Sequence, residues 1–249
     1  MALFLGIVQG LTEFLPVSSS GHLILFQHLF KLPSDMLLFN IILHIATLLA
    51  VVIVFRKTIF KLVRHPFNKI NLYLIISTVI TCILVVLFKD TIDKTFTHRI
   101  LPFTFLVTAI ILYSTTFINN DKPRKLYGEV TATSAVAVGI TQFIAVIPGI
   151  SRSGTTIATM LAAGVKRERA AEYSFLMSIP IIIASFVYEI ISLEGKPALD
   201  IAPTIVAFIA ALVSGIIAIK FMLKIIQRVR LHWFSLYLVA LALVCLIIL

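Results

Sequence analysis

The sequence predicts an all-α integral membrane protein, and three observations support this prediction: an apolar composition, apolar stretches of spanning length and an internal repeat. Of the 249 residues, 60% are hydrophobic and only 13% are charged, and the mean hydropathy is +1.09. One soluble core could not bury so much apolar surface, so lipid has to act as the solvent for much of the chain. We therefore predict a single membrane domain that covers residues 1–249.

Six apolar stretches have about the 20 residues that a helix needs to cross a bilayer. They are predicted as transmembrane helices over residues 36–55, 72–88, 101–118, 173–193, 201–219 and 231–249. The longest polar connection covers only residues 56–71, which leaves no room for a soluble domain between the spans.

Residues 139–157 repeat residues 6–24 without a gap. Identical residues occupy the pairs Gly6/Gly139, Ile7/Ile140, Gln9/Gln142, Ser18/Ser151, Ser20/Ser153, Gly21/Gly154 and Ile24/Ile157. Most of these residues are polar or glycine, so a shared apolar bias does not explain the match. The chain is therefore predicted to consist of two halves, repeat 1 over about 1–118 and repeat 2 over about 131–249.

The number of spans between the two copies predicts their relative orientation. Three predicted spans follow each copy, and an odd number of crossings turns the second half upside down, which gives an inverted-topology repeat as in many membrane transporters. Each copy is broken, at Pro16 and at Pro148 with Gly149, into arms too short to span. We predict two re-entrant helical hairpins whose tips meet near the bilayer midplane.

The net charge of +10 predicts orientation rather than a nucleic-acid partner. Basic residues concentrate in the segments 56–69, 122–125, 166–169 and 220–230. In the predicted topology these segments share one face, which the positive-inside rule makes cytoplasmic, so the N-terminus lies outside. The basic excess then contacts anionic membrane lipids, and no nucleic-acid partner is expected.

Serine-rich helix starts follow both breaks. Ser18, Ser19 and Ser20 begin the second arm of the first hairpin, and Ser151 and Ser153 flank Arg152 in the second hairpin. Serine hydroxyls cap the free N–H groups of a helix start, and that start attracts anions.

Arg152 adds a planar fork of donors that suits phosphate or carboxylate oxygens. Its alternative role is to pair with Glu13 and hold the hairpins together, although an ionisable residue within a membrane indicates function by default. The two tips together therefore predict an anion site.

Other polar residues surround the predicted tips. Gln9 and Glu13 lie four positions apart on one helix face, and Glu13 could accept a proton, hold a divalent cation or balance Arg152. His22 follows the first tip, where we hypothesise a catalytic or phosphate-binding role over that of an interior hydrogen-bonding group. For Asn40 and His44 we expect interhelical hydrogen bonds first and a substrate path second.

Two segments, QGLTEFLPVSSSGH and PGISRSGTT, resemble the signature motifs of the bacterial undecaprenyl-diphosphate phosphatases of the bacitracin-resistance type. The resemblance extends over the full chain. It implies hydrolysis of undecaprenyl diphosphate to undecaprenyl phosphate in the bacterial inner membrane, at a site open to the outer face and with a divalent cation, Mg²⁺ or Ca²⁺. It also implies recycling of the lipid carrier for peptidoglycan synthesis, and bacitracin resistance.

The resemblance also implies roles for single residues. Ser19 matches the nucleophile, Glu13 its acidic partner and His22 the histidine of the first motif. Arg152 with Ser151, Ser153 and Thr156 matches the motif that holds the phosphate. Ser18 and Ser20 of the first tip are predicted to bind phosphate as well. Gln9 stands at a position where many members carry Glu. The predicted metal ligands are therefore Glu13 and, with a neutral amide in place of the second carboxylate, Gln9.

Without the resemblance, an anion site within an inverted repeat also suits a transporter or flippase of a phosphate-bearing polyprenyl lipid. The nucleophile distinguishes the two classes, because phosphoryl transfer needs a hydroxyl beside a base and transport does not. Ser19 near Glu13 and His22 therefore favours the hydrolase. The sequence leaves a homodimer open.

Overall fold

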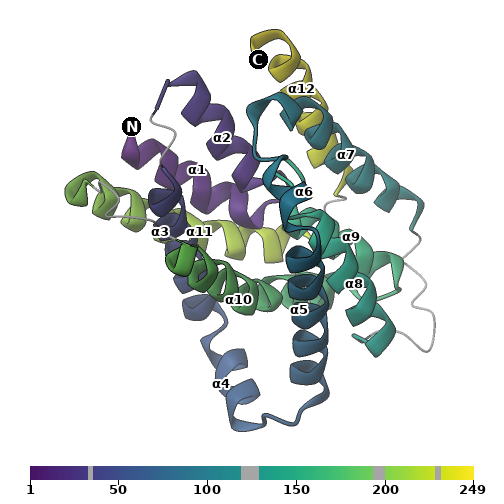
Figure 1. The fold of residues 1–249 in the computed structure, drawn as a ribbon. Helices are drawn as coiled ribbons and strands as arrows, with labels where there is room; N and C mark the ends of the chain where they lie inside the picture. Colours follow the sequence, from purple (N-terminus) through teal and green to yellow (C-terminus); the bar gives the residue numbers. More distant parts are fainter. Residues whose placement is uncertain (33–35, 119–128, 193–199, 228–230) are drawn as a thin grey trace.

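The computed structural model describes residues 1–32, 36–118, 129–192, 200–227 and 231–249, and every regular element in these ranges is a helix (Figure 1). The basic segment predicted at 122–125, residues 228–230 of the last basic segment and the end of the predicted span 173–193 lie outside these ranges.

Each of the six predicted spans coincides with a helix, which confirms their positions. These helices are α3 (Leu37–Val54), α5 (Lys69–Leu87), α7 (Leu101–Ser114), α10 (Arg167–Ser192), α11 (Ile201–Ile225) and α12 (His232–Ile248). Short helices lie between them: α4 (Arg56–Arg64), α6 (Lys89–Asp93), η1 (His98–Ile100) and η2 (Thr115–Phe117).

The predicted number of six spans is not confirmed by the helices that the structure describes. In the described residues, four helical segments are long and apolar enough to cross a membrane, those of α5, α7, α10 and α11. A fifth span results if α3 and α4, which meet at an angle of 78°, count as one. The remaining helix, α12, has 17 residues, fewer than the roughly 20 that a span needs. The chain is therefore a multi-pass helical membrane protein, with four to five helices of spanning length and composition among its described residues.

The bend between α3 and α4 follows from their sequences. Helix α3 is apolar, whereas α4 begins with Arg56 and Lys57 and has Lys61 and Arg64 in its last turn, all of them exposed. Basic side chains are costly in hydrocarbon, and an amphipathic helix is more stable along the membrane surface. The chain thus leaves the direction of α3 at Phe55.

Two helical hairpins carry the repeated segments. The first consists of α1 (Ala2–Phe14) and α2 (Ser19–Leu29), and the second of α8 (Ala132–Ile144) and α9 (Arg152–Ala162). Arms of 13 and 11 residues are about 20 and 17 Å long at 1.5 Å per residue, well short of a hydrocarbon core of about 30 Å. The chain breaks where predicted, at Pro16 and at Pro148 with Gly149, whose φ is +90°.

The first arm of each hairpin packs on a helix from the other half of the chain. Helix α1 lies along α11, and α8 lies along α5. A methyl group at Gly6 would overlap the carbonyl of Ala207, and one at Gly139 would lie 2.8 Å from the carbonyl oxygen of Ser77. Glycine is therefore required at both positions for the helix backbones to approach so closely.

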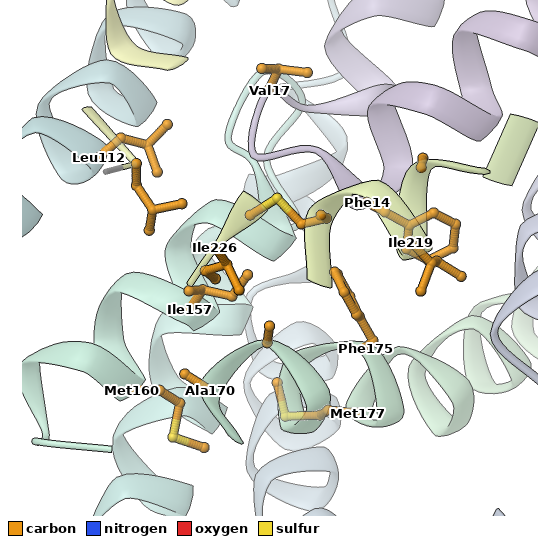
Figure 2. Packing of buried hydrophobic residues seen from close by; sticks show 14 of the residues in the cluster. Phe14, Val17, Leu112, Ile157, Met160, Ala170, Phe175, Met177, Ile219 and Ile226 are labelled. Carbon is orange, nitrogen blue, oxygen red and sulfur yellow. The ribbon is translucent and has the colours of Figure 1, made fainter. Parts of the chain in front are cut away.

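The apolar core includes residues next to the first hairpin tip, such as Phe14 and Val17. The rings of Phe14 and Phe175 meet edge to face, with centroids 5.5 Å apart and planes at 89°, and Ile219 lies beside them (Figure 2). All three side chains are completely buried. Van der Waals packing of this kind holds helices together in lipid, so it helps to fix the end of α1, where Glu13 directly precedes Phe14.

Candidate active site

The tips of both hairpins border one cavity of about 280 Å³. Helices α3 and α10 complete its walls. Polar lining residues are Thr12, Glu13, Ser18, Ser19, Ser20, Asn40, His44, Gln142, Ser151, Arg152 and Ser185. The apolar lining includes Leu23, Ile24, Ile41, Phe96, Ile150, Ile181, Ile182 and Phe186. The cavity therefore combines a polar end at the tips with an extended apolar wall.

The first tip places Ser19 at the start of α2. Ser18 is the N-cap, and its hydroxyl accepts a hydrogen bond of 3.3 Å from the backbone N–H of Gly21. The backbone of Ser18 has φ +69° and ψ +100°, a conformation that residues other than glycine rarely adopt. Such strain persists only where neighbouring contacts impose it, and it is common at functional sites.

The second tip places Arg152 at the equivalent position, the first residue of α9. Ser151 is the N-cap and accepts a hydrogen bond of 3.1 Å from the N–H of Gly154. The hydroxyl of Ser153 donates to the carbonyl oxygen of Leu15 over 3.0 Å, which joins the second tip to the first. Two capped helix starts thus border the same cavity, and both attract negative charge.

Glu13 connects the two tips at the centre of the site. One of its carboxylate oxygens, Oε1, forms an ion pair with Nη2 of Arg152. The other, Oε2, accepts hydrogen bonds from the hydroxyl of Ser19 over 2.5 Å and from Nε2 of Gln9 over 3.1 Å. The structure thus brings together four of the residues predicted for the site.

The contact between Ser19 and Glu13 has the geometry of a nucleophile and its base. A serine hydroxyl is a weak nucleophile unless an adjacent group takes its proton, and that group has to lie within hydrogen-bonding distance. Oε2 of Glu13 is at 2.5 Å from the hydroxyl oxygen and so can accept the proton directly. The pair can therefore attack an electrophilic centre bound in the cavity.

Arg152 retains a free donor beside this pair. Its Nη1 group is buried and has no hydrogen-bond partner among the described residues. An unpaired buried donor costs about 1–3 kcal/mol, and an anionic oxygen in the cavity would satisfy it. Arg152 can therefore hold an anion while Nη2 still contacts Glu13.

His22 is not among the residues that line the cavity, and its catalytic or phosphate-binding role stays a prediction. Only 3% of His22 is exposed, and both ring nitrogens have partners. Nδ1 donates to the carbonyl oxygen of Ser18 over 2.7 Å, and Nε2 lies 2.7 Å from the hydroxyl of Tyr237 on α12. In this position His22 holds the strained turn that presents Ser19.

A different histidine faces the site. Nε2 of His44 lies 3.7 Å from Oε2 of Glu13, and Nδ1 donates to the carbonyl oxygen of Asn40 over 2.8 Å. The spacing of residues predicts that His44 shares a helix face with Asn40, but it does not reveal Glu13 as its neighbour across the cavity. The interhelical bond expected of Asn40 is confirmed, because its side chain accepts from Gln27 of α2 over 2.7 Å.

The residues predicted to hold phosphate divide into two groups. Ser18, Ser20 and Ser151 line the cavity, together with Arg152. Thr156 does not, since it is fully buried and its hydroxyl lies 2.6 Å from that of Ser174, which ties α9 to α10. Ser153 is absent from the lining as well, because its hydroxyl binds Leu15. Both residues position the second tip and do not reach the cavity.

The two predicted metal ligands do not fit a cation bound by the protein. Both carboxylate oxygens of Glu13 already have partners, and Gln9 presents its amide nitrogen to them. Among the described residues, no group of three or more His, Cys, Asp or Glu side chains is placed to hold a metal ion. A hard divalent cation needs free oxygen ligands, and the oxygens of Glu13 are not free while Arg152, Ser19 and Gln9 contact them.

Fold and site together define a class: a multi-pass helical membrane protein with a cavity in which a serine hydroxyl donates to a carboxylate that is paired with an arginine. The comparison with known families agrees with this class. The family model described as bacitracin resistance protein BacA matches residues 2–244, and the chain belongs to this family.

Known proteins similar to this chain share one name. A protein of Carboxydothermus hydrogenoformans is 42% identical over 95% of this chain and 92% of its own length, and it is named undecaprenyl-diphosphatase. Proteins of Treponema denticola and Korarchaeum cryptofilum with the same name are 41% and 40% identical. These matches cover 97% and 95% of this chain and 94% of each relative. The similarity thus extends over nearly the whole of each protein.

Proposed function

We propose that this chain is a membrane hydrolase that removes the terminal phosphate of undecaprenyl diphosphate to give undecaprenyl phosphate. The observation that carries the proposal is the Ser19 hydroxyl bound to the Glu13 carboxylate beside Arg152, in a cavity with an apolar wall. The name shared by the relatives, undecaprenyl-diphosphatase, supports the same reaction and substrate. A flippase would need the cavity but not the activated serine, so the hydrolase is favoured.

The first chemical step is the transfer of the terminal phosphoryl group to Ser19. The hydroxyl oxygen attacks the terminal phosphorus while its proton passes to Oε2 of Glu13. The bond from that phosphorus to the bridging oxygen breaks, and undecaprenyl phosphate leaves. Arg152 and the two helix starts stabilise the charge that develops on the phosphoryl oxygens.

The second step releases phosphate. A water molecule attacks the phosphoserine, the bond from phosphorus to the Ser19 oxygen breaks, and that oxygen takes a proton back. Glu13 is placed to return it, because it received the proton in the first step and remains held by Gln9. Hydroxyls of Ser18, Ser20 and Ser151 line the cavity where the phosphoryl oxygens lie in this proposal.

The polyprenyl chain lies along the apolar wall in this proposal. Ile181, Ile182 and Phe186 of α10 and Ile41 of α3 border the cavity beside the polar tips. Apolar contacts of this kind do not depend on chain length, so we expect weak discrimination between polyprenyl lengths.

The same proposal includes the architecture of two inverted repeats, about 1–118 and 131–249, with re-entrant hairpins at the start of each. The packing of α1 on α11 and of α8 on α5 supports it, because these two helix pairs correspond to each other in the repeat. The lengths of the hairpin arms also favour re-entrance. If α3 and α12 are counted with the four long spans, the total is the six of an inverted repeat.

The proposed setting is the bacterial inner membrane, with the N-terminus and the open side of the site at the outer face. There the enzyme would recycle the lipid carrier for peptidoglycan synthesis and confer bacitracin resistance. Substrate and membrane lipids are the proposed partners, and a homodimer remains a prediction. The basic, exposed α4 supports this orientation through the positive-inside rule.

Phosphate release tests the proposal. The purified chain is incubated with undecaprenyl diphosphate in detergent, and free phosphate and the lipid product are measured. We expect one phosphate and one undecaprenyl phosphate for each substrate consumed, and no release from undecaprenyl phosphate itself. Binding of the lipid without release of phosphate would contradict hydrolysis and favour the flippase.

A further inference from the structure

The one carboxylate that lines the cavity among the described residues, that of Glu13, is already neutralised. Oε1 of Glu13 pairs with Arg152, and Oε2 accepts hydrogen bonds from Ser19 and Gln9. A divalent cation on either oxygen would lie beside the guanidinium of Arg152, and like charges at such short range repel strongly in a medium of low dielectric constant. Arg152 therefore occupies the carboxylate of Glu13 that a metal ion would need.

Gln9 reinforces this arrangement. It is fully buried, and its Nε2 group donates to Glu13 over 3.1 Å, while its Oε1 has no hydrogen-bond partner among the described residues. The opposite amide orientation would place the carbonyl oxygen against the carboxylate, two acceptors without a hydrogen between them. Gln9 thus acts as a donor to Glu13 and not as an oxygen ligand beside it.

The charges of the cavity and the headgroup do not balance without a further cation. Among the described residues that line the cavity, Glu13 and Arg152 are the charged ones when histidine is neutral, and their charges cancel. Even one phosphate monoester has a charge of about −1.5 to −2 at pH 7, and the charge of a diphosphate is more negative. Mg²⁺ is commonly held by substrate phosphates and a few waters rather than by a protein cage.

From these three observations we infer that the divalent cation enters the site on the lipid, chelated by its diphosphate, and that the protein alone has no site for it. The inference rests on the proposed function, because it names the substrate as a complex of cation and polyprenyl diphosphate. The protein supplies serine hydroxyls and Arg152 for the outer phosphate oxygens, and the cation neutralises the headgroup before it meets the site.

Binding of Mn²⁺, measured by the electron paramagnetic resonance signal of the free ion, tests the inference without catalysis. The full chain in detergent is titrated with Mn²⁺, first alone and then as Ser19→Ala with undecaprenyl diphosphate, so that the lipid stays intact. We expect no bound Mn²⁺ on the lipid-free protein, and one ion retained with the protein per bound lipid. One Mn²⁺ per lipid-free chain, lost in Glu13→Gln, would overturn the inference.

Gln9→Glu is the matched variant that shows the method can detect a protein-bound ion. It places a second carboxylate four residues from Glu13 on the same helix face, and two carboxylates together attract a hard cation. We expect this variant to bind Mn²⁺ without lipid at least tenfold more tightly than the wild-type chain. Equal lipid-free binding by the variant and the wild type would contradict our placement of Gln9 against Glu13.

Kinetics provide a second, independent readout. If the cation belongs to the substrate, the rate of phosphate release follows the fraction of lipid in complex with Mg²⁺. With lipid well below its KM, the half-maximal Mg²⁺ concentration then equals the dissociation constant of that complex measured without protein. A half-maximal concentration at least tenfold lower would indicate a protein site and overturn the inference. A chain that releases no phosphate fails the proposed function, while its lipid-free Mn²⁺ titration still decides the inference.

Discussion

The two hairpin tips have similar local structures and carry different chemistry. In both, a serine N-cap precedes a helix of 11 residues, and a second serine and a glycine follow. The first helical residue differs, because it is Ser19 in α2 and Arg152 in α9. The backbones of the caps differ as well, since Ser18 has φ +69° and Ser151 has φ −74°. The strained tip holds the candidate nucleophile, and the relaxed tip holds the anion-binding group.

This difference shows how a repeated anion-binding loop can become an enzyme site. Two capped helix starts alone attract a phosphate but cannot break its bonds. The first copy adds Glu13, and the second copy has Val146 at the equivalent position. Catalysis in this proposal thus depends on Ser19 and Glu13, which only the first copy has. Binding uses the capped helix start of both copies and Arg152 of the second.

The largest expected effect is at the nucleophile. Ser19→Ala removes the hydroxyl that Glu13 binds, and we expect phosphate release to fall on the order of a thousandfold or more, because no neighbour replaces a covalent nucleophile. Folding should stay near normal, since Ser18 and not Ser19 caps the helix. The exposed Ser114 on α7 gives a control, Ser114→Ala, with unchanged release. Near-normal turnover by Ser19→Ala would move the role to Ser18.

The next largest effect is at the equivalent residue of the second tip. Arg152→Lys keeps the charge but loses the planar fork, and we expect phosphate release to fall about a hundredfold, as for the loss of one donor to a transition-state oxygen. The exposed Arg169, which pairs with Glu172, provides the control Arg169→Lys. A mild loss in Arg152→Lys would mean that this residue only balances the charge of Glu13.

A smaller effect is expected where α12 supports the strained tip. Tyr237→Phe removes the hydroxyl that holds His22 and keeps the ring, so we expect kcat to fall about tenfold at unchanged KM, the equivalent of one hydrogen bond. The matched control is Tyr113→Phe, because Tyr113 is exposed on α7. A lower melting temperature with unchanged kcat would show that Tyr237 stabilises the fold without positioning Ser19.

The smallest effect concerns stability and compares the two caps directly. Glycine tolerates positive φ, so Ser18→Gly loses a cap but relieves backbone strain, whereas Ser151→Gly only loses a cap. We expect Ser18→Gly to be the more stable variant by about 1 kcal/mol, measured as the midpoint of thermal unfolding in detergent. Equal destabilisation by both substitutions would contradict the difference in strain between the tips.

The helices could be predicted from sequence more fully than the number of spans. Apolar stretches located all six long helices, and Pro16 and Pro148 located both breaks. Composition alone does not determine the number of spans, because α12 has only 17 residues and α3 joins the basic α4 at a bend. Hydropathy shows which segments of the chain prefer lipid to water. It does not show whether a helix crosses the whole bilayer.

The centre of the site could be predicted as well, but not its surroundings. The meeting of Ser19, Glu13 and Arg152 could be predicted, because the repeat predicts two tips that face each other. His22 turns away because of Tyr237, which is 215 residues distant in the chain, and no local pattern reveals such a partner. His44 reaches Glu13 through the packing of α3 on α1, which the spacing of residues within α3 cannot show.

The ion pair between the tips has a consequence for how the protein is made. It joins Glu13 to a residue 139 positions later, so the first hairpin leaves the ribosome long before its partner. An unpaired carboxylate at the bilayer centre costs about 2.5–3.5 kcal/mol on scales of membrane insertion. The first hairpin is therefore expected to remain near the aqueous surface during synthesis and to insert fully only when Arg152 arrives. Assembly of the fold and completion of the site then become one event, and truncated chains would lack both.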